Sequence, residues 1–255
     1  MRLVEQSLVL AEEHADGADH YRLLETLRQY GHERLAVSGE AESVHARHAA
    51  YYLALAEEAE SHLVRREQLG WLDRLETEHD NLRAALRWSL DGGDLQAGLR
   101  AASALRWFWW LRAHRVEGLA WLTELLAAPG AAVWTTSRAN AQGLAGFLTY
   151  VLEDWQRGHA LLEESLVMAR QVGAPATAAF ALLWLGHSAW QSRRDPELAR
   201  RLKEEGLALA RDVGDLGVIA ASLIFLAQME GVASNHARAR ALPVSYPHLT
   251  LPTLL

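Results

Sequence analysis

An internal repeat of 41 residues constrains this chain more than any other feature of its sequence. Residues 161–173, LLEESLVMARQVG, align with residues 202–214 when shifted by 41 positions, and the next segment continues the alignment. The identical pairs are Leu161/Leu202, Glu163/Glu204, Glu164/Glu205, Leu166/Leu207, Ala169/Ala210, Arg170/Arg211, Val172/Val213, Gly173/Gly214, Ala179/Ala220, Leu182/Leu223 and Leu185/Leu226. Each unit is expected to be two antiparallel helices, with a glycine closing the second helix as a C-cap. Such a unit cannot bury its apolar face alone, so the repeat predicts a stacked helical solenoid.

The rest of the chain is also predicted to be helical, apart from its first residues. Apolar residues recur at steps of three and four in the segments 44–64, 71–90, 95–113 and 116–128, and helix is expected as far as about residue 242. The short apolar runs 3–12 and 21–24 flank a turn-like EEHADGAD and predict two strands in a loose hairpin. A helix should follow from Glu25 and end at SGE, residues 38–40. The predicted fold class is therefore all-α, with a short N-terminal β-hairpin.

Three large–small dipeptides refine the type of repeat. Leu185-Gly186 stands where tetratricopeptide repeats place a pair that lets the two helices of a unit approach closely, and Ala145-Gly146 and Leu226-Ala227 are its equivalents in the neighbouring units. The period exceeds the 34 residues of the standard tetratricopeptide unit. The sequence thus predicts tetratricopeptide-like repeats with longer helices, and leaves the subclass open.

Composition excludes several classes of protein. Half of the 255 residues are apolar and 22% are charged, as in a globular chain, and the longest uncharged apolar stretch is only residues 218–227. The absence of cysteine excludes a disulfide scaffold and a thiol nucleophile, and with no secretory signal it indicates a cytoplasmic protein. The formal net charge of −7 argues against direct binding of nucleic acid by this chain.

Three blocks of sequence resemble a segment of bacterial STAND-type regulators, large ATPases of the LuxR-like kind. They are YRLLETLRQYGHERL at 21–35, HARHAAYYLALAEEAE at 45–60 and WLDRLETEHDNLRAALRWSLDGGD at 71–94, with further support from residues 107–127. In that family a P-loop ATPase domain precedes a winged-helix domain and a tetratricopeptide-like array. The resemblance implies that residues 1–40 are the end of a winged-helix domain and 41–135 a helical linker with the first helical pairs. It also implies that 136–242 are tetratricopeptide-like repeats.

The same resemblance shows what this chain lacks. A P-loop requires G-x-x-x-x-G-K-[ST], and the only lysine, Lys203, lies in ELARRLKEEG without the preceding glycines. We therefore expect no ATP hydrolysis by this chain, and the ATPase domain of the full-length parent becomes an expected partner. Residues 1–43 hold nine acids against four arginines, whereas a DNA-reading wing should be basic. A packing role is expected for this segment.

The final 13 residues, PVSYPHLTLPTLL at 243–255, break the helical pattern. They hold three of the six prolines of the chain and no charged residue. They resemble translated adapter read-through, so they are interpreted as a non-native tail, with a genuine disordered C-terminus as the alternative.

Two groups of polar residues are candidate chemical sites. His45 and His48 are three apart on one helix, a spacing that can share a metal ion, but no HExxH motif or carboxylate completes the set. Residues 78–81 (Glu-His-Asp-Asn) are consecutive on a predicted helix, so their side chains should diverge. The resemblance to STAND-type regulators implies that these residues serve helix packing and capping.

Two further features have structural explanations that we favour over chemical ones. Gly186-His187-Ser188 lacks the second glycine and the preceding strand of a G-x-S-x-G nucleophile elbow, so the repeat accounts for Gly186. All ten tryptophans lie between Trp71 and Trp190 and are expected mainly in the core. Because Trp107, Trp109 and Trp110 cannot share one helix face, at least one should lie at a seam between helices or in the groove.

The sequence leads to one main prediction and one alternative. The main prediction is a non-catalytic sensor or scaffold segment of a STAND-type transcriptional regulator, with a protein or small effector bound on the concave repeat face. No catalytic, cofactor-binding or metal-binding residue is assigned, no cofactor or membrane contact is expected, and the partner-binding residues are not identified. The alternative is a small metal- or acid-base-dependent enzyme that uses His45, His48 or residues 78–81.

Overall fold

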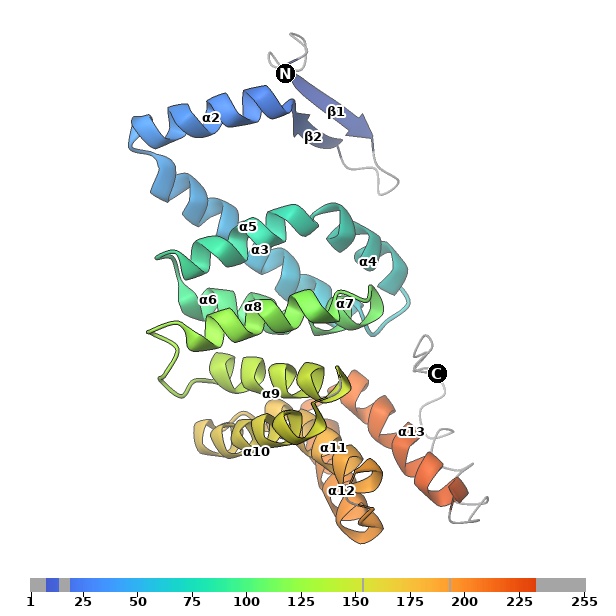
Figure 1. Cartoon of the computed structure of the whole chain (residues 1–255). Helices are drawn as coiled ribbons and strands as arrows, with labels where there is room; N and C mark the ends of the chain where they lie inside the picture. Colours follow the sequence, from blue (N-terminus) through green and yellow to red (C-terminus); the bar gives the residue numbers. More distant parts are fainter. Residues whose placement is uncertain (1–7, 14–18, 153, 193, 233–255) are drawn as a thin grey trace.

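The computed structural model describes residues 8–13, 19–152, 154–192 and 194–232. The predicted tail at 243–255 and the predicted helix beyond residue 232 lie outside these residues. Two short strands, β1 (Val9–Glu13) and β2 (Asp19–Leu23), pair antiparallel with Val9 opposite Leu23 (Figure 1). The predicted N-terminal hairpin is confirmed.

Helix α2 (Glu25–Ser38) follows the hairpin and ends as the SGE segment predicts. Gly39 adopts a left-handed conformation with φ 77°, which glycine enters at little cost. None of the residues of α2 is buried, and Tyr30 and Val37 are among its exposed apolar side chains. Figure 1 shows α2 and the hairpin standing off the end of the helical stack. In the described chain, then, no apolar side chain of α2 is fully buried.

Six helices form the N-terminal half of the stack. They are α3 (Ala41–His62), α4 (Gln68–Thr77), α5 (His79–Leu90), α6 (Leu95–Ala104), α7 (Arg106–Leu111) and α8 (Arg115–Ala127). The prediction of single helices over 71–90 and 95–113 was wrong, because the first is interrupted at Glu78 and the second at Leu105. The Glu78 carboxylate accepts hydrogen bonds from Tyr52 of α3 and from Asn81. Helical periodicity cannot predict the bond from Tyr52, because Tyr52 belongs to another helix.

Five helices of 16 to 18 residues form the C-terminal half and follow the 41-residue period. They are α9 (Thr136–Val151), α10 (Trp155–Val172), α11 (Pro175–Gln191), α12 (Pro196–Val213) and α13 (Leu216–Val232). Gly173 and Gly214 close α10 and α12 with φ 69° and 74°. Asp154 and Asp195, also 41 positions apart, cap the starts of the same helices by accepting from backbone N–H groups. The caps thus repeat with the period that the identities indicate.

The helices of a unit pack as closely as the large–small pairs predict. A Cβ atom at Gly146 of α9 would lie 3.0 Å from the backbone nitrogen of Leu162 on α10. A Cβ atom at Gly186 of α11 would lie 2.7 Å from Cγ of Lys203 on α12. Ser165, late in α10, donates to the carbonyl of Ala139, early in α9, so the pair is antiparallel. The predicted helical hairpins are confirmed.

The helices are arranged in a continuous stack. The helices α3, α6, α9, α11 and α13 lie side by side in that order, and we call them the first-helix layer. One hydrophobic cluster extends through the stack from Leu55 of α3 to Leu226 of α13. The structure is therefore the predicted all-α helical solenoid. None of the described helices combines the length and apolar character that a membrane span requires.

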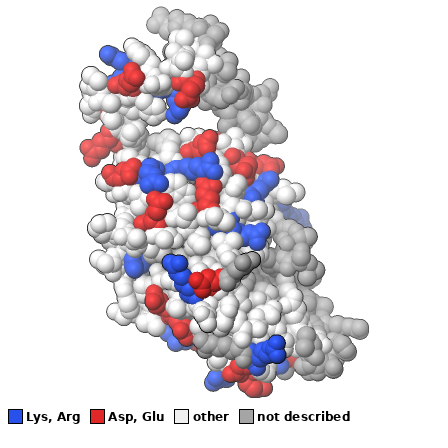
Figure 2. Space-filling model, viewed as in Figure 1, with Lys and Arg blue, Asp and Glu red and all other residues white. Residues whose placement is uncertain are grey.

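Ion pairs connect α5 and α8 on the outside of the stack. Arg83 holds Glu117 at 2.6 Å, and Arg87 holds Glu124 at 3.0 Å. Figure 2 shows acidic and basic side chains interspersed over this face, without a large area of one sign. This face lacks the stripe of basic side chains by which proteins bind the phosphate backbone of nucleic acids.

Candidate ligand-binding cavity

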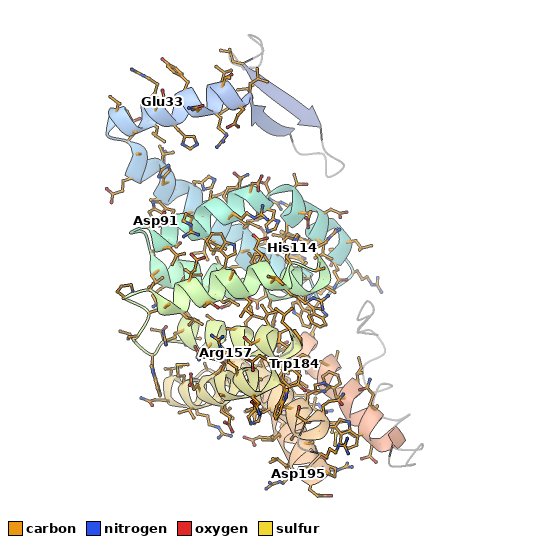
Figure 3. All side chains as sticks on the ribbon, viewed as in Figure 1. Glu33, Asp91, His114, Arg157, Trp184 and Asp195 are labelled. Atoms are coloured by element: carbon orange, nitrogen blue, oxygen red, sulfur yellow. The ribbon has the colours of Figure 1, made fainter. Side chains whose placement is uncertain are left out.

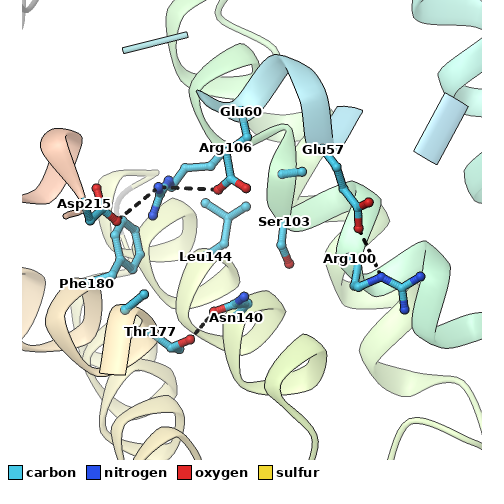
Figure 4. A pocket seen from close by; sticks show the side chains of 12 residues that line it. Glu57, Glu60, Arg100, Ser103, Arg106, Asn140, Leu144, Thr177, Phe180 and Asp215 are labelled. Atoms are coloured by element: carbon cyan, nitrogen blue, oxygen red, sulfur yellow. Dashed lines mark hydrogen bonds and ion pairs between the residues drawn. The ribbon is translucent and has the colours of Figure 1, made fainter. Parts of the chain in front are cut away.

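A cavity of about 260 Å³ opens on the first-helix layer, where α3, α6, α9 and α11 meet (Figure 4). Its polar lining residues come from five helices and the residue before α13: Glu57, Glu60, Arg100, Ser103, Arg106, Asn140, Thr177 and Asp215. Two pairs of these are already joined, Arg100 to Glu57 at 3.2 Å and Thr177 to Asn140. Cavities lined by a few converging polar groups are typical sites of small-molecule binding.

Arg106 is the central residue of this cavity. Its Nη2 lies 3.6 Å from a carboxylate oxygen of Glu60 on α3 and 3.6 Å from one of Asp215 at the start of α13. Both separations exceed hydrogen-bond distance, and the buried Nε has no hydrogen-bond partner among the described residues. Arg106 therefore retains hydrogen-bonding capacity that an anionic group could use.

The two carboxylates beside Arg106 differ in their surroundings. Burial raises the pKa of Glu60, opposed by the nearby Arg106 guanidinium and reinforced by the charge of Asp215. Asp215 also caps α13 by accepting from the backbone N–H of Val218 at 3.0 Å. Asp215 is therefore fixed by the helix, whereas Glu60 is the carboxylate more easily displaced from Arg106.

An aromatic pocket adjoins the polar cavity and shares Arg106 and Phe180 with it. The Arg106 guanidinium carbon lies 5.0 Å from the ring centre of Phe180 and 5.4 Å from that of Trp107. Aromatic side chains from α7, α9, α11 and α13 line the pocket: Trp107, Trp110, Phe147, Phe180, Trp184 and Phe225. Figure 3 shows Trp184 at the junction of these helices. The aromatic pocket itself holds only about 30 Å³, too little for a ring, so the apolar part of a ligand at Arg106 would contact Phe180, which lines both hollows.

The tryptophans of α7 lie at helix seams, as the sequence predicts. Trp109 is fully buried, and its Nε1 donates to the carbonyl of Ala102 at 3.0 Å. Trp107 packs so closely on α13 that a Cβ atom at Gly217 would lie 2.4 Å from its ring. Trp110 packs on Phe147 of α9. One short helix therefore joins the N-terminal and C-terminal halves of the stack.

Two of the four side chains of residues 78–81 contact each other, and the other two point in different directions. Glu78 and Asn81 meet at 2.7 Å, and Asn81 lies 3.3 Å from Nε2 of His48, so the prediction of complete divergence was wrong for this pair. They meet because residues three apart share a helix face. Asp80 turns outward to Arg83, and His79 turns inward. His45 and His48 line an open hollow between α2 and α5.

A second group of possible metal ligands forms where α4, α5 and α8 meet. Within the described ranges, Glu76, His79 and His114 offer ligand atoms that all lie within 4.8 Å of one another. Sequence reasoning missed this group because His114 lies 35 positions after His79, with no spacing rule to connect them. His45 and His48 belong to no such group of three among the described residues.

Ser188 takes part in a triad-like arrangement that the sequence did not indicate. Nδ1 of His159 lies 3.0 Å from Ser188 Oγ, and Nε2 of His159 lies 3.3 Å from Glu163. Ser188 has no exposed surface, and Gly186 packs against α12 rather than forming a strand-to-helix elbow. Without access for a substrate the serine cannot act as a nucleophile in this conformation. The repeat accounts for Gly186, whose close contact with α12 is observed.

Known proteins resemble this chain in sequence and in fold. Three curated relatives, from Mycobacterium bovis and two strains of Mycobacterium tuberculosis, carry the name "Putative HTH-type transcriptional regulator" and are 41% identical over 194 residues, 73% of this chain. This chain spans only 22% of their length. The crystal structure of BtubC (BKLC) from P. vanneervenii superposes with a TM-score of 0.53 at 16% identity, covering 81% of this chain and 93% of that one. No family model matches.

These similarities support a coarse conclusion. Most of the chain is similar to one segment of longer proteins that are named as putative HTH-type transcriptional regulators. The similarity to BtubC concerns the fold alone. Neither the family to which the sequence blocks point nor the cavity around Arg106 is identified by these comparisons.

Proposed function

We propose that this chain is a non-catalytic sensor segment of a transcriptional regulator, and that an effector bound at Arg106 changes how the stack is held together. The observation that carries the proposal is the position of Arg106 between Glu60 of α3 and Asp215 of α13. One side chain thereby connects two helices at opposite ends of the first-helix layer. The 41% identity to named transcriptional regulators supports the regulatory setting.

The chemistry of the cavity suggests the class of effector. A carboxylate or phosphate could replace Glu60 at the Arg106 guanidinium, and the unpartnered Nε offers it a further hydrogen bond. An apolar or aromatic part of the effector would contact Phe180 and Leu144, which line the same cavity. Loss of the Glu60 contact would loosen α3 from α13, a rigid-body change that a longer regulator could transmit.

The finer assignment rests on the sequence blocks. We propose that the longer regulator is a cytoplasmic, LuxR-like STAND ATPase with tetratricopeptide-like repeats. In this proposal the hairpin and α2 complete a winged-helix domain, which would explain why α2 buries none of its residues in the described chain. ATP hydrolysis and DNA binding would belong to other parts of that regulator.

Two measurements test the proposal. In a longer regulator that contains this segment, Arg106→Met should change basal reporter output, whereas Arg201→Met on the exposed face of α12 should not. In the isolated chain, a thermal-shift screen of aromatic carboxylates should give hits that Arg106→Met abolishes and Arg201→Met retains. Unchanged reporter output in the Arg106 variant would rule out the sensor role. Hits that survive Arg106→Met would place the effector site elsewhere.

A further inference from the structure

We propose that Glu76, His79 and His114 form a binding site for a divalent transition-metal ion, with Zn²⁺ as the best-matched ion. The proposal is independent of the Arg106 cavity, because the three residues lie on α4, α5 and the start of α8. Figure 3 shows His114 within the N-terminal half of the stack.

The geometry of the three side chains favours a common ligand. Nε2 of His114 lies 3.1 Å from both carboxylate oxygens of Glu76, and the rings of His79 and His114 are 4.4 Å apart between centroids. One ligand atom from each residue falls within 4.8 Å of the others. Ligands bound to one zinc ion at bond lengths of about 2.0–2.2 Å would be roughly 3–4 Å apart. Small side-chain movements would therefore close the site.

A buried, unsatisfied nitrogen gives an independent reason to expect a ligand. His79 is only 6% exposed, and its Nε2 has no hydrogen-bond partner among the described residues. A polar atom buried without a partner costs free energy that a bound ion can recover. The carboxylate of Glu117, 3.3 Å from this nitrogen, already holds Arg83 through two hydrogen bonds. Glu117 is therefore assigned as a neighbour of the site and not as a ligand.

The donor set determines the kind of ion. Two imidazoles and one carboxylate suit zinc and similar transition metals, whereas calcium and magnesium require mostly oxygen ligands. Three protein ligands leave a coordination position for water or for a group from a partner. His79 packs edge-on against Phe108 at 5.1 Å between centroids, so one side of the site is apolar. A bound ion would tie α4 and α5 to the start of α8.

The test uses the untagged chain after dialysis against EDTA. Isothermal titration with ZnCl₂ should show one ion bound per chain, and Co²⁺ should give the visible absorption bands of a site with nitrogen and oxygen ligands. Zinc should also raise the melting temperature, because the site exists only in the folded chain. Loss of a ligand should weaken binding by more than about 10-fold.

Matched variants decide between this site and adventitious binding. His114→Ala and Glu76→Gln, both at partly exposed side chains, should lose the zinc-dependent rise in melting temperature and the tight binding. The double variant His45→Ala/His48→Ala removes the other histidine pair and should bind zinc as the unaltered chain does. Circular dichroism confirms that each variant folds, and Glu76→Gln preserves shape if His114→Ala does not fold. Absence of stoichiometric zinc binding by the unaltered chain would overturn the proposal. So would zinc binding by His114→Ala and Glu76→Gln that is as tight as that of the unaltered chain.

Discussion

The ammonium group of Lys203, the single lysine of the chain, lies 4.9 Å from the centre of the Phe225 ring, in the seam between α12 and α13. Its other close polar contact is the sulfur of Met229 at 3.5 Å. Lys203 is 1% exposed, and this burial lowers its pKa to about 8. A cation is thus held mainly by weak acceptors.

Lys203→Met should stabilise the chain. A pKa lowered from 10.5 to about 8 means that burying the charged ammonium opposes folding, and at pH 7 the substitution should raise the free energy of unfolding by about 1–3 kcal/mol. Urea denaturation at pH 7 measures the change. Arg201→Met, at an exposed neighbour on α12, should stay within about 0.5 kcal/mol of the unaltered chain. A Lys203→Met variant less stable than the unaltered chain would contradict the prediction.

Stability should rise with pH over two ranges. Between about pH 8 and 10.5 the unfolded chain keeps the Lys203 proton that the folded chain has lost, so the free energy of unfolding increases with pH. Burial and the charge of Lys203 lower the pKa of His187 from 6.5 to about 4, so stability also falls as the pH drops through that interval. Thermal melts from pH 4 to 10 measure both slopes. Lys203→Met should remove the alkaline slope, and His187→Gln should reduce the acid slope; unchanged slopes would refute the assignment.

The sequence anticipated the features that repeat and missed those that depend on tertiary contacts. The glycines at 146, 173, 186 and 214 were identifiable because close helix approach and left-handed caps each demand a glycine. The interruption at Glu78 had no such signal, because hydrogen bonds from Tyr52 and Asn81 hold it. Arg106 was not singled out, since Glu60 and Asp215 reach it from distant parts of the sequence. Candidate ligand sites in a solenoid arise between repeats, and the periodicity of the sequence does not predict which side chains meet there.

Gly158→Ala should be among the most destabilising single-methyl additions in the stack. A Cβ atom there would lie 2.5 Å from the backbone nitrogen of Tyr150 on α9, and backbone cannot move aside as a side chain can. The free energy of unfolding should fall by at least about 2 kcal/mol. Gly70→Ala, on an exposed face of α4 with no atom within 4 Å, should instead raise it by about 0.5–1 kcal/mol. Urea melts of both variants give the comparison, and equal effects would show that the α9–α10 contact is looser than described.

Ser188→Ala should affect stability and leave ester hydrolysis unchanged. The substitution removes the hydroxyl 3.0 Å from Nδ1 of His159 in a buried position, at a cost of about 1–2 kcal/mol. A catalytic serine would need an exposed Oγ next to a general base, and Ser188 has no exposed surface. The rate of p-nitrophenyl acetate hydrolysis and the labelling by a fluorophosphonate probe should therefore be the same in the unaltered chain and in Ser188→Ala. The hydrolysis rate should equal the background rate of an unrelated chain with a similar number of histidines. Labelling that disappears in Ser188→Ala would show that α10 and α11 open far enough to expose a nucleophile, and would contradict the structural role of Ser188.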